Sequence, residues 1–248
     1  MEKNIIDVLA RRASVRAYDK ERPLPQGVLE KLLTAAMQAP TTGNMQLYSV
    51  IITDSTDGKE RLKQLHFGQP MAADCAALLT FCADVHRFGR WCAARKAQSG
   101  LDNGGGMLMA MEDAVIFAQQ FVTLAEAEGL GTCYLGTVPY NIEAFAKELN
   151  LPSGVMPLFS VAVGYPAGER PAPSDRLPLE AVMHHEKYRR PAADDIDAWY
   201  SAKEALPESV RFIAENGKET LAQVYADVRY PRAQNEKIAA DLVPFFFC

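Results

Sequence analysis

The chain has 248 residues, 48% of them hydrophobic and 23% charged, and a formal net charge of −5 at pH 7. This composition is ordinary for a globular protein of one large or two small domains, and it lacks the broad basic character of a nucleic-acid binder. No apolar run reaches the roughly 18 residues of a membrane span, and the charged start MEKNIIDVLARR lacks a secretory signal's apolar core. We therefore expect a cytoplasmic protein without nucleic-acid or membrane partners.

The hydrophobic pattern changes repeatedly between helical and strand periods, which predicts an α+β domain followed by a helical tail. A short helix capped by Asn4 comes first, a Pro-rich loop covers 169–178, and the tail from 191 is typical of two or three helices. Longer helices are predicted at 25–37, 57–66, 107–129 and 141–150, and strands at 47–53, 76–84, 131–137 and 156–166.

The helix predicted at 107–129 is apolar around most of its circumference, with one clear stripe. A helix so poor in polar faces is expected to be buried, in a core or between subunits. It follows a glycine-rich break at 104–106. The stripe consists of Leu108, Met111, Val115, Ala118 and Val122.

The segment RASVRA, 12–17, has a period of two. If it is extended, its two guanidiniums and one hydroxyl point to one side and its small apolar groups to the other. Fork-shaped donors of this kind suit a phosphate, although a solvated edge strand would show the same pattern. The polar side would consist of Arg12, Ser14 and Arg16, and the apolar side of Ala13, Val15 and Ala17.

Two further stretches could bind a ligand. The loop APTTGNMQ, 39–46, offers hydroxyls and carboxamides to a flat heteroaromatic ring, or is simply a capped helix-to-strand connection. The stretch GLGTCYLGT, 129–137, lacks the spacing of a dinucleotide or phosphate-binding loop, so its glycines more plausibly allow close backbone approach or end a helix.

Other catalytic patterns are weak. His184 and His185 are adjacent and point apart, while His66 and His86 have no carboxylate at ligand spacing. The five cysteines form no C-x-x-C pair, and no nucleophile motif surrounds any of them. We therefore name no catalytic residue and no metal ligand.

The order of these segments is more specific than any one of them. The motif RR-x-S-x-R, a helix, APTTGNMQ before a strand, Gly68-Gln69-Pro70, GLGTCYLGT and a Pro-rich loop with Arg176 together resemble the nitroreductase family. The resemblance covers about residues 3–190 and is nearest to the family's NADPH-dependent nitroreductase and flavin reductase branch.

The resemblance implies an FMN site. The FMN phosphate and ribityl region would be held by Arg12, Ser14, Arg16 and Arg176. The isoalloxazine would be lined by Thr41, Thr42, Asn44 and Gln46, with Gln69 on its polar edge and Tyr134, Leu135, Gly136 and Thr137 along one face.

The resemblance also implies a three-layer α-β-α fold with a mostly antiparallel sheet. Residues 1–190 would form the FMN-binding domain and 191–248 a helical C-terminal extension of the same domain. The family is a homodimer with FMN at the interface, where hydride passes from NAD(P)H through FMN to a nitroaromatic, quinone or flavin acceptor by a ping-pong mechanism. Ser174 stands where this branch often has a lysine.

Two alternatives stay open. One is a different enzyme on the same fold, a dehalogenase or a flavin-cleaving enzyme, with a substrate lid in 86–106. The other is a non-enzymatic FMN-binding protein whose acidic tail meets a partner.

Overall fold

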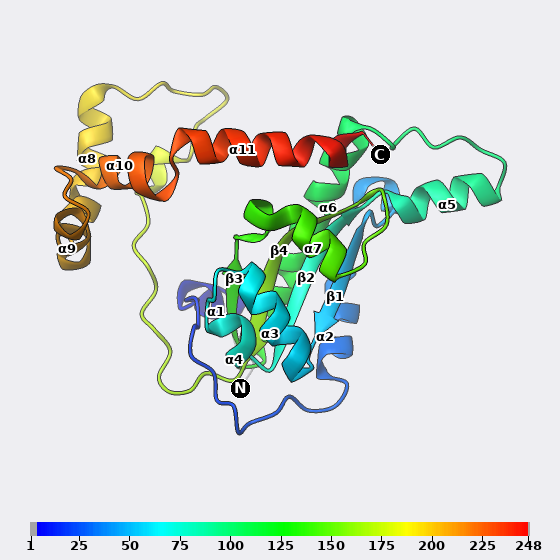
Figure 1. The fold of residues 1–248 in the computed structure, drawn as a ribbon. Coiled ribbons are helices and arrows are strands. Elements are labelled where there is room, and N and C mark those ends of the chain that lie inside the picture. Colours follow the sequence, from blue (N-terminus) through cyan, green and yellow to red (C-terminus); the bar gives the residue numbers. More distant parts are fainter. Residues whose placement is uncertain (1–3, 248) are drawn as a thin grey trace. The chain divides into compact units, whose positions relative to one another are not determined.

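The computed structural model describes residues 4–247, shown in Figure 1. The chain divides into two compact units, which are described separately. The first runs up to Pro173 and takes in the chain again from Ala240, and the second is Ser174–Ala239. The sequence predicted a domain over 1–190 with 191–248 as a helical extension of the same domain.

A four-stranded sheet organises the first unit. Its order is β1-β2-β4-β3, and every neighbouring pair is antiparallel, which confirms the predicted sheet type. All residues of β2 are buried, as expected for an apolar strand in the interior of a sheet covered on both faces. The strands are β1 (Tyr48–Thr53), β2 (Ala77–Asp84), β3 (Gly131–Leu135) and β4 (Val155–Gly164).

Two helices cover one face of the sheet, α6 (Gly104–Ala127) and α2 (Val28–Ala36), and α1 (Ile5–Ala10) packs against α6. Leu79 and Phe81 of β2 point to this face and share a core cluster with Phe117 of α6. By length and composition α6 could cross a bilayer, but its packing against β2 and α2 is that of a core helix.

The helices α3 (Thr56–Leu65), α4 (Met71–Asp74) and α7 (Ile142–Glu148) cover the other face. Leu78 of β2 and Ala162 of β4 point to them, in alternation with the residues that face α6. The unit is therefore the three-layer α-β-α arrangement predicted from the resemblance, visible in Figure 1.

The remaining elements of this unit are short. Helix α5 (His86–Ala94) follows β2, and the one-turn segments η1 (Thr42–Asn44) and η2 (Val138–Asn141) precede β1 and α7. Near the C-terminus, η5 (Val243–Phe246) packs its phenylalanines on a cluster that includes Met107.

The second unit is helical, as expected for the tail. It carries η3 (Leu179–Ala181), α8 (Ala193–Glu204), α9 (Pro207–Glu215), the single turn α10 (Leu221–Gln223) and a π-helical stretch, η4 (Val224–Arg229). Helix α11 (Arg232–Leu242) leads back to the first unit. Trp199 of α8 is buried, and its indole N–H donates to Glu180 over 3.2 Å.

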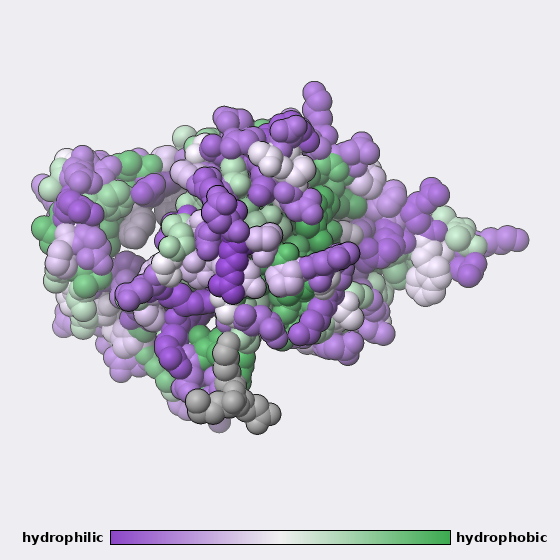
Figure 2. All heavy atoms as spheres, turned by 90° about the horizontal axis from the view of Figure 1, so that it is seen from below, coloured by the Kyte–Doolittle hydropathy of each residue, from purple (hydrophilic) through white to green (hydrophobic). Residues whose placement is uncertain are grey.

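Three details differ from the prediction. The helix expected from residue 25 begins at Val28, because Gly27 adopts φ +76° and ends the preceding turn. Glycines 104–106, expected as a break, form the first turn of α6, since the Asn103 side chain caps it. The apolar stripe of α6 is only partly buried within this chain, since Leu108 is 54% and Val115 49% exposed. Figure 2 shows one face of the protein, where green, hydrophobic side chains lie among mostly purple, hydrophilic ones.

Candidate functional site

The arginine segment lies along the free edge of β3. The Val15 backbone N–H donates to the Thr132 carbonyl over 2.9 Å, and the side chains of Ala13 and Val15 are 3% and 2% exposed. Gly131 makes this approach possible, because a Cβ there would lie 2.7 Å from the Val15 side chain. Arg12 and Ser14 keep part of their surface in solvent, so the predicted alternation holds as far as Arg16.

The alternation ends there, and the prediction for Ala17 is wrong. Ala17 is exposed, whereas Tyr18 is buried with its hydroxyl donating to the Ala162 carbonyl over 3.0 Å. The segment changes its pairing partner at this point, from β3 to the stretch after β4, since the Ala17 carbonyl accepts from Ala167 N–H and Tyr18 bridges Pro166. The period of two thus covers 12–16 alone.

Two guanidiniums of this segment are available to a ligand. Among residues 4–247 no side-chain hydrogen bond or ion pair is found for Arg12 or Arg16. Arg11 is different, because its Nε donates to the Asp7 carbonyl at the end of α1 over 3.2 Å. Burial raises the pKa of Tyr134 to about 12, and the positive charge of Arg12 works against this rise.

The end of β3 presents its residues in different directions. Tyr134 lies on the α6 side, with its hydroxyl 3.4 Å from Gln119 Oε1 and its ring 5.1 Å from that of Phe159. Leu135 is buried in the cluster on the opposite face, so only its backbone can meet a ligand. Gly136 is exposed, and its position leaves a Cβ unobstructed.

Gln69 and Thr137 meet just beyond this strand end. Gln69 Nε2 donates to Thr137 Oγ1 over 3.4 Å, and His66 Nδ1 lies 2.7 Å from the same oxygen. His66 Nε2 lies 3.1 Å from Ser160 Oγ. Burial lowers the pKa of His66 to about 4, so its ring is neutral at pH 7.

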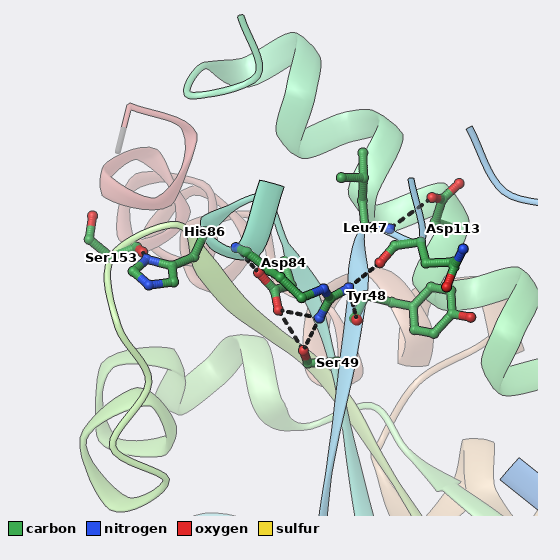
Figure 3. A network of polar contacts seen from close by, with 9 residues as sticks. Leu47, Tyr48, Ser49, Asp84, His86, Asp113 and Ser153 are labelled. Carbon is green, nitrogen blue, oxygen red and sulfur yellow. Dashed lines mark hydrogen bonds and ion pairs between the residues drawn. The ribbon is translucent and has the colours of Figure 1, made fainter. Parts of the chain in front are cut away.

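The second candidate loop stands before β1 and is held from two sides. The Asp113 carboxylate accepts from the backbone N–H of Thr42 (2.8 Å) and of Leu47 (3.1 Å), as Figure 3 shows for Leu47. On the other side, Arg87 of α5 donates to the carbonyls of Gln46 and Tyr48. The charged side chains of Asp113 and Arg87 therefore fix the loop backbone by hydrogen bonds, and we call these two contacts the clamps of the loop.

The clamps hold a backbone that would otherwise be unfavourable. Gly43, Asn44 and Gln46 all have φ between +53° and +57°, a region that residues with a Cβ rarely adopt. The side chains of Asn44 and Gln46 are bonded to one another over 3.1 Å. Thr41 contributes a hydroxyl that is buried and without a hydrogen-bond partner among the described residues.

The structure therefore collects the predicted residues into two groups. Arg12, Ser14, Arg16, Gln69 and the 134–137 stretch lie at the β3 edge, and residues 41–46 lie at the β1 edge. Since neighbouring strands are about 4.8 Å apart, the two edges are separated by about 14 Å within one chain. Arg176 belongs to the second unit, where its Nη1 donates to the carbonyls of Ser174 and Asp175.

Sequence reasoning missed three side chains that support these groups: His66, Asp113 and Arg87. Asp113 carried one signal, a carboxylate on the apolar helix 107–129, whereas His66 and Arg87 carried none. No group of His, Cys, Asp and Glu that could hold a metal ion occurs in the described part of the chain.

Comparisons with known proteins identify the family and the fold. The nitroreductase family profile matches residues 9–165. The Cr(VI) reductase of Pseudomonas sp. (strain G-1) is 32% identical over 203 residues, which cover 79% of this chain and 83% of that protein. An NADPH-dependent oxidoreductase of Staphylococcus aureus (strain USA300) is 33% identical over 193 residues, which cover 76% of this chain and 75% of that protein. A crystal structure from Bacteroides fragilis NCTC 9343 superimposes with a TM-score of 0.93 at 43% identity, covering 97% of this chain and 99% of its own.

The layered antiparallel sheet and these relatives define an α+β oxidoreductase. The chain belongs to the nitroreductase family.

Proposed function

We propose that this chain is an FMN-binding, NAD(P)H-dependent oxidoreductase that delivers reducing equivalents to a small-molecule acceptor in the cytoplasm. The observation that carries the proposal is the pair of guanidiniums, Arg12 and Arg16, that lie at the β3 edge without an acidic partner among residues 4–247. Unpaired arginines beside polar side chains and an exposed strand end are typical of a site for a phosphorylated ligand.

The residues present fit FMN. Arg12, Arg16 and the Ser14 hydroxyl would hold the phosphate, and Gln69 and Thr137 would meet the polar edge of the ring system. From the other group, the buried Thr41 hydroxyl has no hydrogen-bond partner in the part of the chain that the structure describes, and the loop backbone is fixed by Asp113. An orphaned buried hydroxyl is costly unless a ligand or partner satisfies it.

When bound, FMN would supply the hydride chemistry. The chain's own task is to bind and orient: the arginines balance the phosphate charge, and the clamped loop needs little rearrangement on binding. Among the described residues we name no side chain as nucleophile or general base, in keeping with chemistry supplied by a cofactor.

We propose that a second copy of the chain completes the site. The two groups of binding residues lie at opposite edges of one sheet, about 14 Å apart with β2 and β4 between them, so both groups of one chain cannot contact the same flavin ring. A two-fold pairing can bring the β3 edge of one chain to the loop of the other. The exposed apolar residues Ile6 (70%), Leu108 and Val115 of α1 and α6 would then find partners.

We propose a chemical class for the electron acceptor rather than a single compound. A flat, electron-poor molecule such as a nitroaromatic, a quinone or a free flavin suits a site built for an aromatic ring, and chromate is added because of the Pseudomonas relative. Arg176 remains a proposed phosphate ligand from the second unit.

The first test is FMN binding. Purified protein should be yellow with about one FMN per chain. Arg16→Gln should weaken FMN binding about 10- to 150-fold. This range corresponds to the loss of one hydrogen bond to a charged group, which contributes roughly 1.5–3 kcal/mol. Arg11→Gln is the matched control, since Arg11 is engaged with Asp7. Colourless protein that takes up no added FMN would refute the proposal, and so would equal loss in both variants.

The second test is kinetic. If nicotinamide and acceptor take turns at one place, double-reciprocal plots at several acceptor concentrations should be parallel. A bound flavin that NADPH bleaches slowly in the absence of oxygen would instead indicate a non-enzymatic FMN carrier.

A further inference from the structure

A chain of hydrogen bonds runs from the interior of the sheet to the candidate site. Thr80 Oγ1 and Ser160 Oγ are 2.9 Å apart, and Ser160 Oγ is 3.1 Å from His66 Nε2. His66 Nδ1 is 2.7 Å from Thr137 Oγ1, which also accepts from Gln69. The side chains of Thr80, Ser160 and His66 are fully buried, whereas Thr137 is only half-buried and reaches the surface.

The imidazole can complete this chain in two ways. A neutral ring has one N–H and one lone pair, so one nitrogen donates and the other accepts. Either Nδ1 donates to Thr137 and Nε2 accepts from Ser160, or both directions are reversed. The choice decides what Thr137 can offer to a ligand.

Counting the protons available for hydrogen bonds decides between these two directions. The three contacts that join Thr80, Ser160, His66 and Thr137 take one proton each, while these four groups carry four. One proton must therefore point out of the chain. Within residues 4–247, Thr80 and Ser160 have no other side-chain hydrogen bond, so a spare proton on either would be a buried donor without an acceptor. The spare proton belongs on Thr137, which alone reaches the surface.

We infer that Thr137 is a hydrogen-bond donor aimed at the ligand, and that His66, protonated on Nδ1, is the positioning residue that sets this direction. Thr80 donates to Ser160, Ser160 donates to Nε2, and Nδ1–H donates to Thr137. The Thr137 oxygen then accepts from both His66 and Gln69 and has only its proton left to offer. The ligand atom at this position is an acceptor, a carbonyl oxygen or an unprotonated ring nitrogen.

This inference rests on the proposed function in one respect, that the acceptor atom belongs to the ring system of FMN. A purely structural role for His66 would be the alternative, since its ring also packs 4.8 Å from that of Phe145. In that case the direction of the hydrogen bonds would not affect the ligand.

The first experiment needs no FMN. Nitrogen-15 NMR of the FMN-free wild-type protein at pH 7 reports which ring nitrogen of each of the four histidines carries the proton. The His66 signal is assigned by its loss in His66→Asn. We expect a protonated Nδ1 and an unprotonated Nε2, whereas a protonated Nε2, or both protonated, would overturn the inference.

The second experiment separates the two ring nitrogens. In His66→Asn the amide nitrogen can replace Nδ1–H and keep donating to Thr137, whereas in His66→Gln the amide oxygen can replace Nε2 and keep accepting from Ser160. FMN affinity, measured by quenching of FMN fluorescence, should stay within about 2-fold of wild type for His66→Asn. It should fall about 2- to 12-fold for His66→Gln and Thr137→Val, the range for one neutral hydrogen bond.

The controls keep the outcomes apart. Thermal unfolding without FMN should be similar for the Asn and Gln variants, because each keeps one of the two contacts of the ring. Equal loss of FMN affinity in both variants, or full affinity in Thr137→Val, would overturn the inference. Wild-type protein that binds no FMN would refute the proposed function, while the NMR result would still decide the direction of the His66 hydrogen bonds.

Discussion

Acidification should destabilise this protein through His66 in a defined range of pH. In the folded chain the ring is fully buried and its pKa is lowered from 6.5 to about 4 by burial. The unfolded chain therefore takes up a proton near pH 6.5, and the folded chain does so only near pH 4. Between these values acid favours the unfolded state; above pH 6.5 the contribution to stability is complete, and below pH 4 it is lost.

The magnitude follows from the shift. At 1.36 kcal/mol per pKa unit, the shift corresponds to about 3 kcal/mol, of which about 2 kcal/mol should be lost between pH 7 and pH 5. Carboxylates also titrate toward the acid end, so the quantity to measure is the difference between wild type and His66→Asn, which cannot bind this proton.

The assay is urea unfolding followed by circular dichroism at pH 7, 6 and 5. The stability difference between wild type and His66→Asn should shrink steadily as the pH falls. If the stability difference between wild type and His66→Asn stays constant from pH 7 to pH 5, the pKa of His66 is not lowered by burial and the reasoning is refuted. If the stability difference instead grows as the pH falls, the pKa of His66 is raised in the folded chain and not lowered.

Three other changes test neighbouring parts of the structure. Gly131→Ala should cost about 1–3 kcal/mol in thermal unfolding, because the new Cβ would lie 2.7 Å from the Val15 side chain, whereas the same change at Gly136, which meets open space, should be nearly silent. Asp113→Asn should weaken FMN by about 10-fold or more in a fluorescence titration, since the carboxylate holds two backbone N–H groups of the loop before β1. Val115→Asp should shift the protein to monomers in analytical ultracentrifugation and lower FMN affinity with it, and a dimer unaffected by this charge would contradict the proposed interface.

The layers of the fold were predictable because strand and helix periods are local. The strand 76–84, the long helix after it and the alternation of Ala13 and Val15 all follow from residues a few positions apart. The alternation failed at Ala17 because a distant partner, the Ala162 carbonyl, binds the Tyr18 hydroxyl and turns that side chain inward.

The supporting residues of the site could not be predicted, and the reason is also physical. His66 depends on Thr137 and Ser160, which lie 71 and 94 positions further along the chain and meet it only through strand pairing. Arg87 binds Gln46 and Tyr48 across about 40 positions in the same way. From spacing alone, His66 offered no carboxylate partner, because its partners are hydroxyls.

The division of the proposed binding residues between the two edges of one sheet has a genetic consequence. If each site takes its arginines from one chain and its loop from the other, a chain lacking Arg16 and a chain lacking a working 41–46 loop can rescue each other. Random pairing of two such inactive variants would restore about a quarter of all sites, in mixed dimers that each hold one intact and one doubly defective site. Two recessive defects in the same gene would then complement, as though they lay in different genes.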